Sequence, residues 1–332
     1  MVNPIPEAQF QVTYVGEIPL VLLPSRLSVL EALTFKRTTQ QLFSGSNIPP
    51  TVIFDFSQTT FIDSSGIGAL ISNLKMARQN GSNLVLRGVN TQVMAVFELT
   101  SLDQVLTFES WQTPPSCHDH HIDSNQLPIT HPSIHSWVKR LMDIVGAIVG
   151  LAITAIIFPL ILIAIELDDP GPIFFGQIRC GWMGKHFRIW KFRSMCVNAE
   201  ALKDQVQNQA EGAIFKNDND PRVTRVGRFL RRSSIDELPQ FWNVLKGEMS
   251  LVGTRPPTPD EVERYEIPQW QRLDVKPGMT GEWQVNGRSQ VKNFEDVIRL
   301  DLKYQENWSL WYDIKLILKT IFILFNKNSG AM

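Results

Sequence analysis

The sequence reads IVGAIVGLAITAIIFPLILIAI from Ile144 to Ile165, and these 22 residues include no charged side chain. As an α-helix, such a run extends ~33 Å, enough to cross the apolar core of a bilayer. Pro159 lies inside the run, where it removes one helical hydrogen bond and frees the carbonyl of Ala155. The stretch therefore predicts a membrane-associated helix with a kink or a break.

Basic residues flank this run on both sides, with Lys139 and Arg140 before it and five lysines and arginines between Arg179 and Arg193 after it. The charge asymmetry that orients a simple span is therefore missing. A re-entrant helix over about 139–167, returning to the cytosolic face, fits these flanks better. An ordinary span with a tolerated proline kink remains the alternative at this point.

The composition limits the other classes of function. Lys+Arg 32 against Asp+Glu 33 gives 332 residues a net charge of -1, so no nucleic-acid partner is expected. The three cysteines are an odd number without CxxC spacing, which indicates neither a disulfide framework nor a zinc ribbon. The segment MVNPIPEAQF has no basic or apolar signal region, so we expect the chain to start in the cytosol.

Residues 1–112 have the pattern of a separate α/β domain. The strand-like runs Val52 to Phe56 and Asn83 to Gly88 enclose a helical pattern that begins after Asp63. A strand, a helix and a second strand in this order imply a parallel pair. Residues 113–135 hold four prolines and five of the six histidines, and we interpret them as a linker.

The linker and the tail each leave an alternative open. A transition metal could bind Cys117 together with the three neighbouring histidines, His118, His120 and His121, but a linker supplies no fixed geometry.

The apolar tail from Trp308 to Phe325 is interrupted by Asp313, Lys315 and Lys319, so it cannot cross a bilayer. We expect a helix lying in the membrane interface, with a buried core helix as the alternative.

Five arginines and no acidic residue occupy Pro221 to Arg232, which predicts a phosphate-rich ligand; a solvated basic face or a contact with anionic lipid is the alternative. Asp236 and Glu237 follow directly. One carboxylate could attack a phosphorus atom while its neighbour holds a divalent cation. The alternative is a helix start at which Ser234 and Glu237 form a capping box. Prolines after Arg255 restrict its backbone, which would hold the guanidinium in place for a phosphate; a plain turn at the exit of a strand is the alternative.

From about Ser136 to the end, the chain resembles the monotopic bacterial sugar transferases, which are polyprenol-phosphate phosphoglycosyl transferases. The matching strings are KRLMDIVGAIVG, DDPGPIFFGQIRCG, KFRSM, PRVTRVGRFLRRSSIDELPQFWNVLKGEMSLVGTRP, KPGMTGEWQVNGR and NWSLWYDIKLILKT. The resemblance implies a mainly α, membrane-associated domain over 136–332, at the cytosolic face of the bacterial cytoplasmic membrane, with a re-entrant helix broken at Pro159.

The same resemblance implies a two-step reaction that initiates a surface glycan. Asp236 takes a phosphosugar from a nucleotide diphosphosugar, expected to be a UDP-hexose, and polyprenol (undecaprenyl) phosphate then removes it. Glu237 is expected to bind Mg²⁺. The residues expected to contact phosphate or nucleotide are Arg231, Arg255, Arg288 and Lys191. The family often has proline where this chain has Thr254, and the loss of that proline is expected to loosen the placement of Arg255. The family also often has arginine where this chain has Gly176. The motifs do not identify the sugar, which could be glucose, galactose or an N-acetylated sugar.

Residues 12–112 resemble a STAS domain, the fold of the anti-sigma-factor antagonists. The motif is Phe61-Ile62-Asp63-Ser64-Ser65-Gly66-Ile67-Gly68. The resemblance implies that Ser64 is phosphorylated and that the domain is regulatory, binding a protein partner or a second copy of the chain. The alternative is that Asp63 and Ser64 only cap a helix. A second hypothesis for the whole chain is a membrane-tethered signalling antagonist whose second half is an inactive anchor.

Overall fold

The computed structural model describes residues 10–44, 48–109, 128–199, 201–202, 206, 217, 220–286 and 294–325. The chain divides into two compact units. The first unit contains 1–130 with two short later segments, Met183–Lys185 and Tyr265–Asp274, and the second contains the rest.

The strands are β1 (Val12–Val15), β2 (Ile18–Leu22), β3 (Arg26–Leu27), β4 (Thr51–Asp55), β5 (Phe61–Ile62), β6 (Asn83–Arg87), β7 (Thr107–Phe108), β8 (Phe174–Cys180), β9 (His186–Phe192), β10 (Ser250–Val252) and β11 (Gly278–Thr280). The α-helices are α1 (Val29–Phe43), α2 (Ser64–Gln79), α3 (Thr91–Leu99), α4 (Pro132–His135), α5 (Trp137–Asp168), α6 (Arg225–Arg232), α7 (Gln240–Lys246), α8 (Pro259–Val262), α9 (Glu282–Asn286), α10 (Phe294–Glu306) and α11 (Leu310–Phe325). The 3₁₀ helices are η1 (Leu102–Gln104), η3 (Trp182–Gly184), η5 (Ile235–Glu237) and η6 (Ile267–Asp274).

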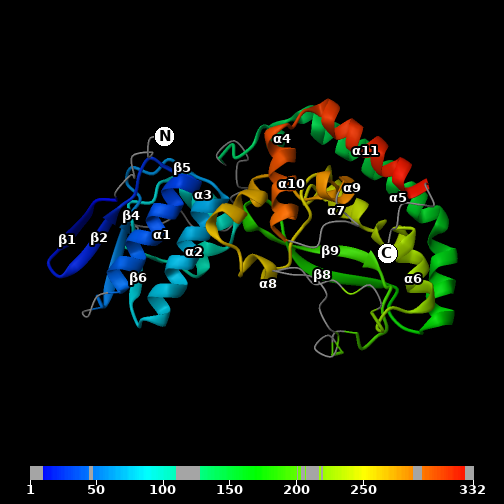
Figure 1. The fold of residues 1–332 in the computed structure, drawn as a ribbon, viewed down its shortest axis with the longest axis horizontal. Helices are drawn as coiled ribbons and strands as arrows, with labels where there is room; N and C mark the ends of the chain where they lie inside the picture. Colours follow the sequence, from blue (N-terminus) through cyan, green and yellow to red (C-terminus); the bar gives the residue numbers. More distant parts are fainter. Residues whose placement is uncertain are drawn as a thin grey trace. The chain divides into compact units, whose positions relative to one another are not determined.

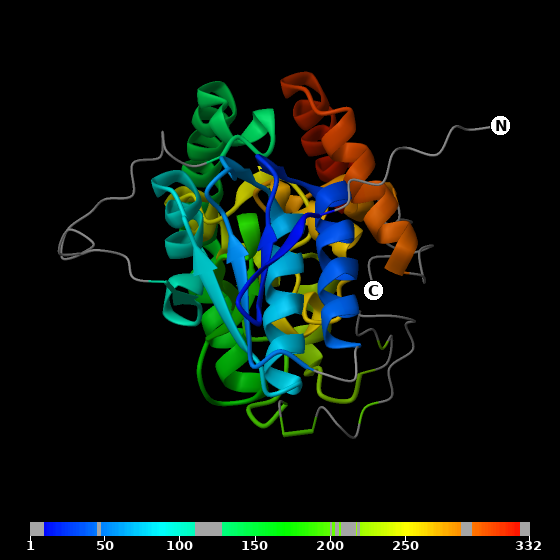
Figure 2. The same cartoon turned by 90° about the vertical axis from the view of Figure 1, so that its left-hand side faces the viewer.

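The first unit is built on a sheet with the strand order β1-β2-β4-β6-β7. β1 and β2 are antiparallel, whereas β2, β4, β6 and β7 run parallel. Val52 pairs with Leu84, so the two strand-like runs of the sequence are adjacent parallel strands. Helices α1 and α2 pack against each other on one face of this sheet (Figures 1 and 2). The predicted α/β domain with a parallel pair is confirmed.

Two residues determine the start of helix α2 at Ser64: Asp63 caps the helix, and Gly66 allows it to approach a neighbouring strand. Asp63 is the N-cap, and its carboxylate accepts a hydrogen bond from the Gly66 backbone N at 3.0 Å. A Cβ on Gly66 would lie 2.5 Å from the carbonyl oxygen of Leu27, so only glycine permits this approach of helix to strand. The capping role considered for Asp63 is therefore present.

Two segments from later in the sequence complete the first unit. Trp270 packs against α2 so closely that a Cβ on Gly68 would lie 2.6 Å from its ring. The Asp274 carboxylate accepts a hydrogen bond from the Ser64 backbone N at 3.0 Å. The N-terminal end of α2 is thus covered by residues outside the predicted domain of 1–112.

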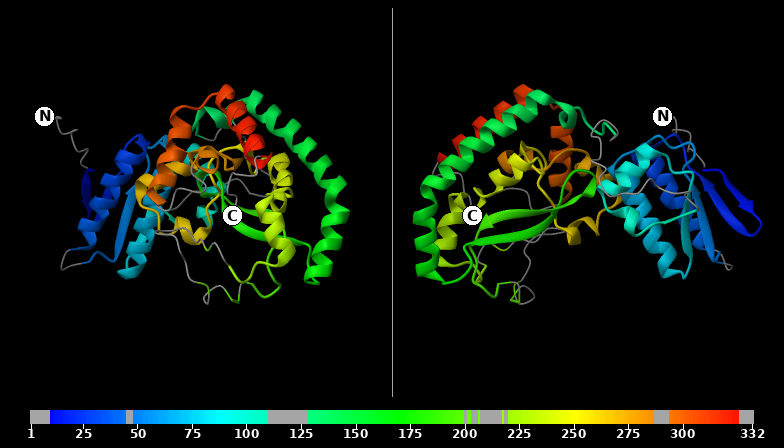
Figure 3. Two further views of the ribbon diagram at one scale, coloured as in Figure 1. Left: turned by 45° about the vertical axis from the view of Figure 1, so that its right-hand side comes forward. Right: turned by 180° about the vertical axis from the view of Figure 1, so that it is seen from behind.

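The second unit contains α5, the helix predicted from the apolar run. Within the described ranges it is the one helix long and apolar enough to cross a membrane, judged by length and composition. It continues through Pro159 without interruption, and Figure 3 shows that it curves. Its exposed side chains are strongly apolar, with Ile156 77%, Leu160 72% and Leu167 82% exposed. Such a face is typical of a membrane contact.

Buried polar contacts fix the beginning of α5. The Lys139 ammonium lies 2.6 Å from the Asp313 carboxylate of α11, and both side chains are buried. Tyr304 donates its hydroxyl hydrogen to the other oxygen of Asp313 at 2.7 Å. Further along α5, Asp143 accepts hydrogen bonds from the Ser250 hydroxyl and the Leu251 backbone N, both at 2.9 Å. These bonds join α5 to α11 and β10.

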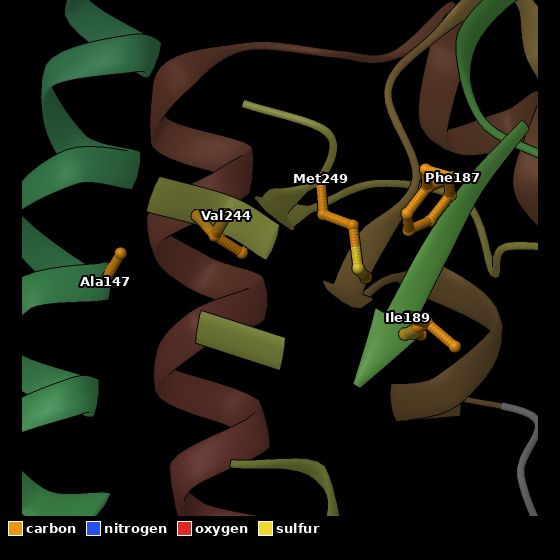
Figure 4. Close-up of a cluster of buried hydrophobic side chains, with 5 residues drawn as sticks. All are labelled: Ala147, Phe187, Ile189, Val244 and Met249. Atoms are coloured by element: carbon orange, nitrogen blue, oxygen red, sulfur yellow. The ribbon is translucent and has the colours of Figure 1, made fainter. Parts of the chain in front are cut away.

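An apolar cluster lies next to these polar contacts. Ala147 of α5, Val244 of α7, Met249 and two residues of β9, Phe187 and Ile189, pack together (Figure 4). Each is at most 7% exposed. The cluster packs strand β9 against α5 and α7. This packing fixes the position of the other side chains on β9.

Candidate active site

A cavity of about 670 Å³ lies in the second unit. Its charged side chains come from β8, β9, η5 and the loop after β10, and its apolar side chains come from α5, α11 and several elements beside them. The polar residues used below are Arg179, Lys191, Glu237 and Arg255, and the apolar residues include Val149, Ile153, Ile317 and Ile321. The cavity therefore combines a charged part with an apolar part.

Lys191 and Glu237 meet at the charged part of the cavity. Lys191 is the next-to-last residue of β9, and its Nζ lies 2.8 Å from Oε1 of Glu237. Their side chains are 27% and 30% exposed, so both reach solvent and a ligand. The structure brings together these two residues, which the sequence placed 46 positions apart.

Asp236 lies beside Glu237 in the short 3₁₀ helix η5 and is only 6% exposed. Ser234 precedes it in the left-handed region at φ 55°, makes no side-chain cap, and α7 begins only at Gln240. The alternative of a helix start with a Ser234 capping box is therefore wrong. A tight turn instead buries Asp236, which is not among the residues that line the cavity, while its neighbour Glu237 faces the cavity.

Arg231 is the next-to-last residue of α6, shortly before this turn. Its Nε donates a hydrogen bond to the Ser194 hydroxyl oxygen at 2.9 Å. Burial lowers the pKa of the Arg231 guanidinium, and the nearby carboxylates of Asp236 and Asp220 oppose that effect. Because it stays cationic, Arg231 provides positive potential next to Asp236.

Arg255 is held by a carboxylate rather than by its neighbouring prolines alone. Its two terminal nitrogens lie 2.9 and 3.2 Å from the two oxygens of Glu261, which is 6% exposed. This two-point contact fixes the guanidinium plane. Thr254, where the family often has proline, is buried at 2% exposure. The expected loosening of Arg255 is therefore offset by Glu261.

Arg179 is a cavity residue that the sequence treated only as a flanking charge. Its Nη1 donates to the Pro256 carbonyl oxygen at 2.9 Å, and two other nitrogens donate to Gln177 Oε1. Burial, followed by the neighbouring Arg255, lowers the pKa of Arg179 to about 10. Two adjacent guanidinium groups repel each other, which favours an anion between or beside them. Its place in the matching string DDPGPIFFGQIRCG was the available signal.

Other predicted site residues lie apart from this cavity or outside the described residues. Arg288 and the linker residues Cys117, His118, His120 and His121 fall outside the described residues. Across the described ranges, no group of three or more His, Cys, Asp or Glu side chains could hold a metal. Ser64 belongs to the first unit, where it is 0% exposed and its hydroxyl contacts the Met183 sulfur at 3.5 Å.

The second unit is thus a membrane-associated domain whose cavity carries a carboxylate, an ammonium group and two guanidinium groups. The chain belongs to the bacterial sugar transferase family, whose model matches residues 134–327. A STAS domain model matches residues 9–113. Both predicted resemblances, and the fusion of the two domains, are confirmed.

Named relatives agree with this assignment. Over 192 residues the chain is 50% identical to a galactosyl transferase, CpsE, of Streptococcus agalactiae, covering 57% of this chain and 42% of that protein. It is 43% identical over 196 residues to the UDP-glucose:undecaprenyl-phosphate glucose-1-phosphate transferase of Escherichia coli, covering 57% and 40%. The chain thus spans less than half of either relative. A solved anti-sigma factor antagonist, SpoIIAA, matches 30% of this chain and 87% of its own at 18% identity, with a TM-score of 0.26.

Proposed function

We propose that the chain transfers a sugar-1-phosphate from a UDP-hexose to polyprenol phosphate. The single observation that carries this proposal is the cavity itself, whose charged part suits a diphosphate and whose apolar part suits an isoprenoid chain. The relatives from Streptococcus and Escherichia support it, because their names describe transfer of galactose and of glucose-1-phosphate.

The reaction we propose has two displacement steps at one phosphorus atom. An oxygen of Asp236 attacks the sugar-bearing phosphorus, a P–O bond forms, and the P–O bond to the nucleoside monophosphate breaks. UMP leaves with the electron pair. The phosphate of the polyprenol then attacks the same phosphorus and releases the Asp236 carboxylate, giving polyprenyl diphosphosugar. Arg179, Arg255 and Lys191 bind the phosphate oxygens of the donor and hold the phosphorus in place for each displacement.

Mg²⁺ is the cofactor that we propose for this site. Glu237 offers a partly exposed carboxylate in the cavity, and Mg²⁺ is commonly held by one or two carboxylates together with substrate phosphates. The donor chemistry fits, with Glu237 as the protein ligand. When bound, the cation neutralises diphosphate charge. Lys191, which pairs with Glu237 at 2.8 Å, is then free to contact phosphate.

We also propose that α5 enters and leaves the membrane on the cytosolic side. Pro159 and the curvature of the helix support this arrangement, and so do the basic residues on both flanks. Both domains then lie in the cytosol, with the cavity at the level of the lipid headgroups. The STAS domain is proposed to regulate the transferase or to bind a protein partner or a second copy of the chain, and phosphorylation of Ser64 stays a prediction.

The proposal is tested with the purified full chain in native lipid particles, Mg²⁺, polyprenol phosphate and a panel of UDP-sugars that includes glucose, galactose and N-acetylated sugars. Wild type is expected to release UMP with at least one donor. Asp236→Asn should lower turnover by several orders of magnitude, because an amide is a poor nucleophile. Asp260→Asn, an exposed change on α8, is the control.

Intact mass spectrometry provides a second readout. Without acceptor, wild type should gain the mass of one phosphosugar, and Asp236→Asn should not. Normal turnover by the Asn variant would show that Asp236 is not the nucleophile. If wild type releases no UMP with any donor, the transferase proposal fails and the tethered signalling protein becomes the better hypothesis.

A further inference from the structure

We propose that a second, smaller cavity in the second unit binds the phosphate of an anionic phospholipid. This cavity, of about 210 Å³, is lined by α9, α10 and α11 and shares no lining residue with the larger one. Its lining includes three lysines, Lys303, Lys315 and Lys319, and one carboxylate, Glu282. The lining thus has a positive excess that the reaction described above does not use.

The carboxylate is already satisfied within the protein. Glu282 is 2% exposed, and its Oε1 lies 3.0 Å from the Lys303 ammonium. The Tyr312 hydroxyl donates to Oε2 at 2.7 Å. Although burial opposes it, these hydrogen bonds lower the pKa of Glu282, which stays ionised and neutralises Lys303. Lys315 and Lys319 therefore give the lining of this cavity a net positive charge.

Neither remaining lysine is neutralised by an acidic side chain of the described residues. Lys319 contacts the neutral Asn286 amide oxygen, and Lys315 forms no salt bridge within the described part of the chain. Both side chains are exposed. Two ammonium groups one helical turn apart, at the rim of a cavity, suit a phosphate.

The helix that carries these lysines also has an exposed apolar stripe. Trp311 is 73%, Leu318 60% and Phe322 68% exposed, and all three lie on one face of α11. At 100° per residue, Lys315 and Lys319 fall along one edge of that stripe. Figure 3 places α11 at the surface of the second unit. An interfacial helix has this arrangement, with apolar side chains among acyl chains and lysines at headgroup level.

The stripe decides which phosphate compound fits. A phospholipid places acyl chains directly beside its phosphate, so one molecule can satisfy both the lysines and the apolar side chains. A free nucleotide has no apolar part for the stripe. Polyprenol phosphate is expected at the larger cavity. We therefore assign the smaller cavity to a phospholipid whose headgroup has a net negative charge, because that charge is attracted to the two lysines.

The test measures lipid retention by native mass spectrometry of the full chain in detergent. Phosphatidylglycerol and phosphatidylcholine with identical acyl chains are titrated separately. We expect the anionic lipid to bind more tightly, and Lys315→Gln with Lys319→Gln to weaken it by roughly tenfold or more, since each basic residue near an anionic surface contributes about fivefold. The matched control, Lys75→Gln with Lys185→Gln, removes the same charge from the first unit.

Further measurements separate this site from its alternatives. Lys315→Arg with Lys319→Arg should keep the anionic lipid bound, because the charge is retained. Equal retention of the two lipids, or no loss in the double Gln variant, would overturn the proposal. So would displacement of phosphatidylglycerol by UDP or by polyprenol phosphate, since the cavity would then serve a substrate.

Discussion

At the scale of single residues, the arrangement of Arg179, Arg255 and Glu261 depends on one carboxylate serving two purposes. Glu261 pairs with Arg255 and also accepts a hydrogen bond from the Thr258 backbone N at 3.0 Å, capping its own short helix. Burial raises the pKa of Glu261, but Arg255, the hydrogen bond from Thr258 and Arg179 together bring it below its ordinary value. The carboxylate therefore stays ionised and keeps one guanidinium aligned while the other lies nearby.

This arrangement predicts the effect of Glu261→Gln. The amide keeps the volume but removes the charge that aligns Arg255, so we expect kcat/KM for the UDP-sugar to fall roughly tenfold, about 1.4 kcal/mol. KM should change more than kcat, because phosphate binding in the ground state is weakened first. Steady-state UMP release measures both. Asp260→Asn on the same helix should leave both unchanged, and equal effects of the two variants would contradict the assignment.

Of the residues that the sequence predicted for the site, Lys191, Glu237 and Arg255 line the cavity. Asp236 and Glu237 follow the arginine cluster directly, and Lys191 and Arg255 lie in recognisable strings. Glu261 and Arg179 were missed, since their roles depend on contacts between segments, such as the bond from Arg179 to the carbonyl of Pro256. The capping-box alternative at Ser234 failed because the backbone turns to positive φ there, which no spacing rule reveals.

At the scale of elements, α5 was predictable from hydropathy, but its attachment was not. The Lys139–Asp313 pair joins residues 174 positions apart, and it is buried beside Tyr304. Removing one partner of such a pair leaves an uncompensated buried charge. Asp313 interrupts the apolar tail, which is why the sequence predicted that the tail cannot cross a bilayer. In the structure, the same residue connects α11 to α5 through its pair with Lys139.

The re-entrant arrangement of α5 predicts a labelling result. Cysteines introduced at Val138 and at Phe174, in a chain whose native cysteines are replaced, should both react with a membrane-impermeant maleimide from the cytosolic side only. Val138 lies in the first turn of α5 and Phe174 lies beyond its end, and the two are 38% and 46% exposed, so both can be reached. Inside-out and right-side-out vesicles make the comparison. Labelling from opposite sides would show a true span. Pro159→Ala, which restores the missing helical hydrogen bond, should increase that opposite-side fraction.

At the scale of the whole molecule, the first unit is assembled from distant parts of the sequence. The STAS motif predicted a strand and a capped helix, and both are present. Trp270 and Asp274 could not be predicted as its partners, because nothing local to residues 265–274 indicates where they pack. These partners bring a second carboxylate to the N-terminal end of α2, beside the carboxylate of Asp63.

Two buried carboxyl groups at one helix end should make the first unit sensitive to pH. Burial raises the pKa of Asp63 to about 6, and burial together with Asp63 raises the pKa of Asp274 to about 7. The negative charge of Glu31 adds to the rise at Asp63, and Arg26 opposes it. The unfolded values lie near 3.8, so between about pH 4 and pH 7 the folded unit binds more protons than the unfolded chain.

The folded unit is therefore expected to lose stability as pH rises from 5 to 7.5, by an amount on the order of 2 kcal/mol. Hydrogen exchange of α2 peptides in the full chain, corrected for intrinsic rates, measures this as falling protection. Asp274→Asn keeps an oxygen for the Ser64 backbone N but removes one charge, so most of the pH dependence should disappear. Glu98→Gln, an exposed change in the same unit, should leave it intact. If protection of α2 rises with pH, or if the Asn variant responds like wild type, the two carboxyl groups do not control this helix end.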